Sequence, residues 1–218
     1  MKFNLNAWVD KLERKYRRFA IPNLMNYIVI GMGIVFLMDM FVRPFTGFSL
    51  SSLLTFSKGA ILRGQIWRLV TFILMPPSAS MIWIFFSLYF YWLIGSTLEN
   101  HWGSFRFNAY YLFGIIGAII AGFITGHATN LYLNLSLLLA FAILYPNHEV
   151  LFLFISIKMK WLAIFDAAMI LLSAWGSGLS GWISLIFSLI NAILFFGSDL
   201  IDVGKSAYRR YKWRQNWK

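Results

Sequence analysis

The chain contains no cysteine, few charged residues and only three histidines. Without cysteine it can form no disulfide bond, no thiolate metal site and no thiol nucleophile. Charged residues make up 12% of its 218 residues, whereas about 25% is usual in a soluble domain. The three histidines, His101, His127 and His148, are far apart in the sequence and form no local group of metal ligands. We therefore predict no metal and no other cofactor, and the composition argues against a soluble domain.

Hydrophobic residues make up 60% of the chain and aromatic residues 19%, which is typical of a protein with several transmembrane helices. Basic residues outnumber acidic ones by 19 to 8, and they gather at the two ends, with six each in residues 1–20 and 198–218. A basic chain can bind nucleic acid. Here, however, the charge flanks hydrophobic runs, where it sets the orientation of a membrane protein. We therefore predict a membrane protein that binds no nucleic acid.

Six hydrophobic stretches predict transmembrane helices in an all-α membrane protein. They are residues 21–40, 81–98, 107–125, 131–145, 161–175 and 182–196. About 20 residues cross the hydrocarbon core of a bilayer, so the short fourth and fifth stretches indicate local thinning or strong packing. Residues 41–80 are too polar to span and too hydrophobic to lie free in solvent, which predicts an interfacial loop with short helices between helices 1 and 2. Residues 149–160 predict a half-buried connector.

The predicted organisation is one membrane domain, residues 21–197, with a basic segment before it and another after it. Residues 1–20 have apolar side chains at spacings of three and four with lysine and arginine between them, which predicts an amphipathic helix on the membrane surface. Residues 198–218 form a basic, aromatic tail. Both segments are expected to contact anionic lipid of the bilayer.

The distribution of basic residues predicts which side of the membrane each end occupies. Six spans place both termini on one side, and if that side is the cytoplasm all but four of the 19 basic residues are cytoplasmic. The four exceptions are Arg43, Lys58, Arg63 and Arg68. This asymmetry predicts a multi-pass protein of the cell membrane with both termini in the cytoplasm. The small size and the lack of a eukaryotic targeting signal indicate a bacterial membrane.

One stretch, residues 63–107, organises the membrane part of the chain. A tryptophan favours the membrane interface and an arginine can bond several carbonyl groups, so Trp67 and Arg68 are assigned as residues that define the fold of the loop before helix 2. The stretch continues with an aromatic run ending at Gly95 and with the blocks Leu98-Glu99, Trp102-Gly103-Ser104 and Arg106-Phe107. In order and spacing these motifs resemble the rhomboid superfamily. The resemblance covers about residues 20–197 and implies a six-transmembrane-helix, rhomboid-like bundle.

Rhomboid proteases are intramembrane serine hydrolases, and the catalytic residues that the resemblance calls for are missing here. The family has H-x-x-x-N on the second helix, where this chain has Trp83 and Ser87. It has Gly-x-Ser-Gly in the fourth span, where Ser136 lies in a leucine run without flanking glycines. It has a histidine in the sixth span, where residues 182–196 contain none. Because a serine needs an adjacent base to become a nucleophile, the resemblance implies a pseudoprotease and no enzyme.

Asp166 is the most unusual residue of the predicted spans. A carboxylate within a span is costly and usually faces the protein interior or a water-filled cavity. It is expected either to bond another helix, through Asn134 or Asn191, or to hold a polar client. Together with Trp83 and Ser87 it forms the predicted binding site for transmembrane segments of client proteins, the function that the resemblance to inactive rhomboids implies.

Two alternative functions stay open at the level of sequence. Ser136 and His127, nine residues apart across a turn, could form a displaced dyad and make the chain an intramembrane serine protease. A transporter or channel for small solutes would give Asp166 a role, but the chain shows no inverted repeat. The sequence names neither the client nor the oligomeric state.

Overall fold

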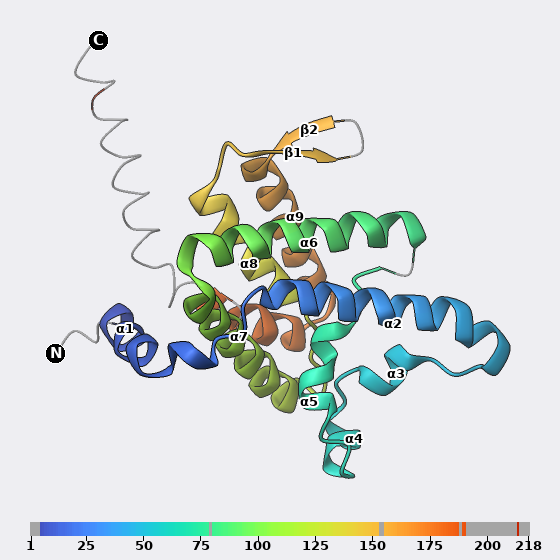
Figure 1. Ribbon diagram of the computed structural model, residues 1–218. Helices are drawn as coiled ribbons and strands as arrows, with labels where there is room; N and C mark the ends of the chain where they lie inside the picture. The colour runs from blue at the N-terminus through green and yellow to red at the C-terminus, as the bar shows by residue number, and fades with distance from the viewer. Residues whose placement is uncertain (1–4, 79, 153–154, 188, 191–212, 214–218) are drawn as a thin grey trace.

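The computed structural model describes residues 5–78, 80–152, 155–187, 189–190 and 213 (Figure 1). The long helices of this part are α2 (Leu24–Thr46), α6 (Met81–Trp102), α7 (Ser104–Thr125) and α9 (Met159–Gly176). Among the described residues these four are long and apolar enough to cross a membrane. Two other helices are α1 (Leu5–Tyr16), which continues into η1 (Arg17–Phe19), and the short apolar α8 (Leu131–Leu144). The chain is therefore a mostly helical membrane protein.

The helices follow the predicted stretches with shifted ends. α2 extends to Thr46, six residues past its predicted end, and α8 has only 14 residues, in line with a short fourth stretch. Residues 179–187 and 189–190 are helical, so the helix of the sixth predicted stretch, residues 182–196, begins three residues earlier than predicted. The remainder of that stretch and the C-terminal tail, apart from Trp213, lie outside the described residues.

The connection from α2 to α6 contains short helices, as predicted. They are α3 (Leu50–Leu54), α4 (Lys58–Leu62), α5 (Arg68–Thr71) and η2 (Phe72–Leu74). Asp39 of α2 accepts hydrogen bonds from the backbone N–H groups of Leu50 and Ser51, where α3 begins. The first N–H groups of a helix have no partner within the helix. Asp39 therefore supplies the acceptors that start α3 and joins the connection to α2.

Three helix ends meet at one buried carboxylate, that of Glu99 near the end of α6. Its Oε1 accepts hydrogen bonds from the N–H of Asn23 (2.6 Å) and from the hydroxyl of Ser104 (2.7 Å). Asn23 precedes α2 in a left-handed conformation (φ 55°), and Ser104 is the first residue of α7. A single residue, Gly103 (φ 82°), separates α6 from α7. Glu99 therefore holds the start of α2 beside the turn between α6 and α7.

The main core lies where α2, α6, α7 and α8 pack together. Its largest fully buried side chains include Met25, Leu98, Phe107, Tyr110, Tyr111 and Phe141. Gly95 of α6 faces Met25 of α2 so closely that a methyl group at Gly95 would lie 2.3 Å from Met25 Cγ. The glycine therefore lets α2 and α6 approach closely, and Figure 1 shows these two helices side by side.

The predicted connector at residues 149–160 contains an antiparallel pair of strands, β1 (Glu149–Phe152) and β2 (Ile155–Lys158). Glu149 pairs with Lys158 and Val150 with Ile157. The all-α prediction does not include these strands. In this register Glu149 and Lys158, which carry opposite charges, face each other at the end of the hairpin where the strands meet the helices. Such cross-strand pairs stabilise a sheet.

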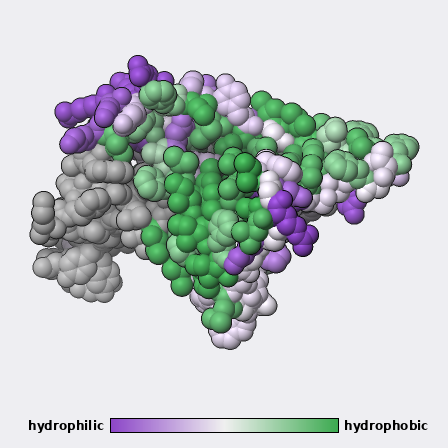
Figure 2. Space-filling view, turned by 90° about the horizontal axis from the view of Figure 1, so that it is seen from below, coloured by the Kyte–Doolittle hydropathy of each residue, from purple (hydrophilic) through white to green (hydrophobic). Residues whose placement is uncertain are grey.

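The outward faces of the long helices are apolar. Only 22–28% of the residues in their most hydrophobic windows are buried. Large exposed side chains occur on each of them: Ile30 and Ile34 on α2, Ile82 and Phe85 on α6, Leu112 and Ile124 on α7, and Phe165 and Leu172 on α9. In Figure 2 hydrophobic residues cover much of the visible face. An apolar exterior on this scale matches a lipid environment.

Candidate functional site

The residues predicted to bind a client line one pocket, between α6, α8 and α9. Its volume is about 260 Å³. Trp83 and Ser87 come from α6, and Asp166 comes from α9. The other lining residues are Phe86, Tyr89, Phe90, Tyr91, Leu131, Asn134, Leu135, Leu138, Val150, Leu162 and Phe165. The structure thus places these three side chains, which are up to 83 positions apart in the chain, around one space.

The α6 wall of the pocket follows from helical spacing. Residues four apart lie on the same face of a helix, so Trp83, Ser87 and Tyr91 form one row. Trp83 is half exposed, whereas Ser87 and Tyr91 are partly buried. Trp83, Tyr89 and, from α9, Phe165 are exposed lining residues, with exposed fractions of 50–66%. The rim of the pocket is therefore aromatic and accessible from outside the bundle.

The polar floor of the pocket is formed by Asn134 of α8. Its side chain is 4% exposed, and neither its amide nitrogen nor its amide oxygen makes a hydrogen bond within the described part of the chain. Buried polar groups are nearly always paired, and leaving one unpaired costs about 1–3 kcal/mol. Asn134 thus presents to the pocket an amide that makes no hydrogen bond of good geometry, with the Tyr91 side chain of α6 close enough to interact with it.

Asp166 is the charged group of the pocket. It is partly buried, and among the described residues its carboxylate makes no hydrogen bond or ion pair, although it interacts electrostatically with the nearby Tyr91 side chain. The expected bond to Asn134 is not made, because both polar atoms of Asn134 are unpaired. The other expected partner, Asn191, lies outside the described residues. The pocket therefore combines an aromatic rim with a carboxylate, a hydroxyl and an amide, a set that can bond a polar group on an otherwise apolar ligand.

Ser136 and His127, the alternative catalytic pair, are not brought together. The Ser136 hydroxyl is 1% exposed, accepts a hydrogen bond from the Tyr110 hydroxyl (2.7 Å) and donates one to the Leu133 carbonyl (2.7 Å). His127 is exposed in the turn before α8. No hydrogen bond joins the two side chains, and both partners of Ser136 are groups that cannot act as a base at neutral pH.

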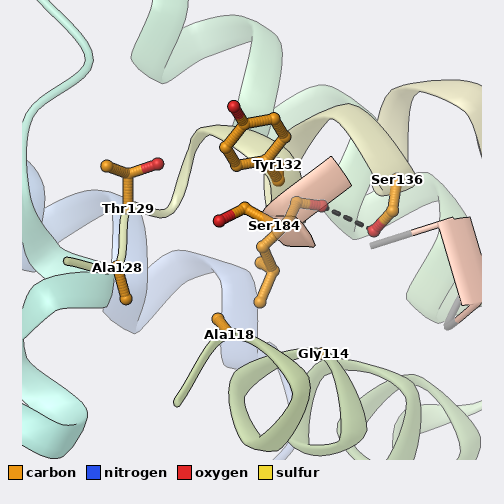
Figure 3. A pocket seen from close by; sticks show the side chains of 8 residues that line it. Gly114, Ala118, Ala128, Thr129, Tyr132, Ser136 and Ser184 are labelled. Atoms are coloured by element: carbon orange, nitrogen blue, oxygen red, sulfur yellow. Dashed lines mark hydrogen bonds between the residues drawn. The ribbon is translucent and has the colours of Figure 1, made fainter. Parts of the chain in front are cut away.

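Ser136 lines a second, much smaller cavity, which Figure 3 shows from close by. The cavity measures about 20 Å³ and lies between α7, α8 and the helical residues 179–187, with Gly114, Ala118 and Ser184 among its lining residues. About this much space holds one water molecule. A peptide bond of a substrate does not fit into this volume. In the described arrangement, therefore, this cavity cannot bring a substrate to Ser136.

Trp67 and Arg68 lie in the connection between α2 and α6, away from the pocket. Arg68 is 9% exposed; its Nη1 donates to the carbonyl groups of Ser52 (2.8 Å) and Thr55 (2.6 Å), and its Nε donates to Gln65 (2.6 Å). The indole of Trp67 donates to the Leu53 carbonyl (3.3 Å). These bonds occupy the carbonyl groups at the end of α3, which have no partner within so short a helix. The pair therefore organises the connection and does not contact the pocket.

Asn134 was considered from the sequence as a partner of Asp166 and was not predicted to belong to the binding site. A signal was present, because Asn134 is the only amide in the leucine-rich run of the fourth stretch. A polar residue in such a run is expected to face protein or a polar cavity. Which of the two it faces depends on the packing of α6 and α9 against α8.

The geometry defines a helical membrane protein with one aromatic-rimmed, polar-floored pocket between α6, α8 and α9. No family model matches the chain, and neither the curated proteins nor the solved structures include a significant match.

Proposed function

We propose that the chain is a non-catalytic, rhomboid-like membrane protein that binds transmembrane segments of client proteins in the pocket between α6, α8 and α9. The observation that supports this proposal most is the unpaired, buried amide of Asn134 beside the carboxylate of Asp166. The proposal includes a bundle of six transmembrane helices with both termini in the cytoplasm.

The physical basis is the difference between this pocket and lipid as surroundings for a polar side chain. In lipid, a polar group of a client helix has no partner other than the client itself. In the pocket it can bond Asn134, Asp166 or Ser87, and one such bond between helices is worth about 1 kcal/mol. The volume of about 260 Å³ is near the lower limit of ligand pockets. The pocket therefore suits one side chain of a client helix, while the helix itself lies against the aromatic rim.

The proposal that the chain is not catalytic rests on the residues that would have to carry out catalysis. Ser136 is bonded to Tyr110 and Leu133, the fourth span has no Gly-x-Ser-Gly motif, and residues 182–196 contain no histidine. No observation favours a hydrolase or a transporter over binding. The shortness of α8 adds support, because a short span thins the bilayer locally and makes lipid a poorer competitor.

Site-specific photocrosslinking in native membranes tests this function. A photoreactive phenylalanine analogue at position 83 is expected to crosslink to a defined set of membrane proteins. The matched control is the same analogue at position 175, because Trp175 is exposed on α9 but does not line the pocket. The crosslinks from position 83 are expected to fall at least about threefold in an Asn134→Leu, Asp166→Leu variant, since roughly 1 kcal/mol per bond is lost.

Two outcomes contradict the proposal. One is an identical set of partners at positions 83 and 175, which means random collisions in the membrane. The other is a set of partners at position 83 that the two leucine substitutions leave unchanged, although the variant folds normally. In that case the polar floor of the pocket has no part in binding.

A further inference from the structure

Another hollow, separate from the proposed client pocket between α6, α8 and α9 and from the cavity at Ser136, lies between α1, η1 and α7. It is lined by Glu13, Arg14, Arg17 and Arg106, and its volume is about 260 Å³. Three guanidinium groups and a single carboxylate therefore surround one space. Guanidinium groups bind phosphate oxygens through paired N–H donors, which makes them well suited to a phosphate ester.

The hollow lies at the end of the bundle where three spans begin or end. Arg106 is the third residue of α7, and α2 begins five residues after η1. The Asn108 amide donates to the Ile21 carbonyl (3.1 Å), and Glu99 bonds both Asn23 and Ser104, so these ends lie at one level. In a membrane, the ends of spanning helices lie among the lipid headgroups. The three arginines are therefore at the depth of lipid phosphates.

An ion pair between Arg106 and Glu13 joins two walls of the hollow. Arg106 Nε donates to Glu13 Oε2 at 3.1 Å, which joins α1 to the start of α7 across 93 positions of the chain. This bond holds Arg106 beside the arginines of the N-terminal segment instead of leaving it to extend into solvent. Figure 2 shows hydrophilic residues gathered at the upper left, over α1, next to the hydrophobic surface of the bundle.

Exposed apolar side chains follow the arginines of the hollow in the chain. Tyr16, Phe19 and Ile21 have exposed fractions of 40%, 64% and 49%. Lys15 Nζ lies over the ring of Tyr16 (5.3 Å) and the Arg18 guanidinium over the ring of Phe19 (4.9 Å). Aromatic rings next to basic groups are typical of a segment that lies in the membrane interface. A ligand in this hollow thus meets positive charge at its head and apolar surface beside it.

We propose that the hollow between α1, η1 and α7 is a binding site for the headgroup of an anionic phospholipid, with Arg14, Arg17 and Arg106 bonding its phosphate. The exposed Phe19 and Ile21 favour a lipid over a free phosphate, because they lie against its acyl chains. Glu13 positions Arg106, and its negative charge lowers the net positive charge of the site. The lipid then joins the N-terminal segment to the membrane domain. This proposal is independent of the client pocket, which lies between other helices.

The test measures binding of short-chain phosphatidylglycerol to the purified full-length protein in a neutral detergent. One variant carries Arg14→Gln, Arg17→Gln and Arg106→Gln. The matched control carries Lys11→Gln, Lys15→Gln and Arg18→Gln, which removes the same charge from the same region without touching the hollow. A basic residue near an anionic lipid surface strengthens binding by roughly fivefold. We therefore expect at least about tenfold weaker binding in the first variant and less than about threefold in the control.

Competition with phosphatidylcholine and with inorganic phosphate completes the test. Neither is expected to displace phosphatidylglycerol at equal concentration. Equal weakening in both triple variants overturns the proposal, because it shows only a diffuse attraction between charges. Displacement by inorganic phosphate overturns it as well, because the ligand is then a free anion. A thermal unfolding curve of each variant without lipid separates loss of binding from loss of fold.

Discussion

Replacing Gly95 by alanine is expected to destabilise the protein by forcing α2 and α6 apart. The added methyl group would lie 2.3 Å from Met25 Cγ, 2.7 Å from Met25 Cβ and 3.0 Å from Met25 Sδ. Met25 is fully buried. A new rotamer of Met25 can move Cγ and Sδ but not Cβ. The helices themselves must therefore shift.

Two effects of opposite sign set the magnitude. Glycine in a helix interior is about 1 kcal/mol less favourable than alanine, so the substitution gains that amount. Adding a methyl group to a filled core costs about 1–3 kcal/mol, and the contact with Met25 Cβ places this site at the upper end. The net loss in free energy of unfolding is about 2 kcal/mol, or roughly 4–8 °C in Tm for a chain of this size.

Gly33→Ala is the matched control, because Gly33 lies on α2 and faces α6. There the nearest atom to an added methyl group is Leu88 Cδ1, at an ordinary contact distance of 3.7 Å. This variant is expected to be as stable as the parent or up to about 1 kcal/mol more stable. Thermal unfolding of both variants in one detergent measures the difference. If Gly95→Ala is as stable as Gly33→Ala, the close packing of α2 on α6 is refuted.

Four further predictions concern the connection, the topology and the chemistry. Arg68→Lys is expected to cost about 2–3 kcal/mol of unfolding free energy, since an ammonium group cannot reproduce the bonds to Ser52, Thr55 and Gln65. Arg63→Lys, at an exposed position, is the control. Equal Tm values of these two variants would contradict the role of Arg68 in organising the connection. Asp39→Ala is expected to cost about 1–2 kcal/mol because the first N–H groups of α3 lose their acceptors, and an unchanged Tm would show that water replaces it. In this cysteine-free chain, Lys15→Cys is expected to react with an impermeant maleimide only after cell permeabilisation and Arg63→Cys before it; the reverse pattern would invert the predicted topology. A fluorophosphonate probe is expected to leave the protein unlabelled, whereas labelling that Ser136→Ala abolishes would establish the serine protease.

The helical framework could be predicted from the sequence because hydrophobic length decides it. The starts of α6 and α8 and the end of α7 agree with the predicted stretches. The start of α2 could not be placed, because it depends on a distant partner: Asn23 bonds Glu99, which is 76 residues later in the chain. No local pattern contains that information.

The hairpin was missed because its signals are weak in an apolar chain. No glycine, proline, asparagine or aspartate occurs between Val150 and Ile157 to mark a turn. The run is, however, rich in β-branched and aromatic residues, and Glu149 and Lys158 stand at its two ends. In the structure these two residues pair across the strands. Opposite charges at the ends of a β-prone run could therefore have indicated the hairpin.

The candidate site could be predicted only in part. Trp83, Ser87 and Asp166 were identified from the resemblance and from the cost of a carboxylate in a span, and the structure places them around one pocket. That they bind a client stays a prediction. The pocket's unpaired amide, Asn134, could not be assigned from sequence because its lack of a partner depends on how three helices pack.

The carboxylate of Glu99 also constrains how the protein is assembled. Asn23 is synthesised 76 residues before Glu99, so until residue 99 is made the N–H of Asn23 lacks the acceptor that it has in the finished fold. The last turn of the second span carries Glu99, so the start of α2 is completed only when that turn is in place. A chain arrested before residue 99 would therefore leave the N–H of Asn23 without this acceptor.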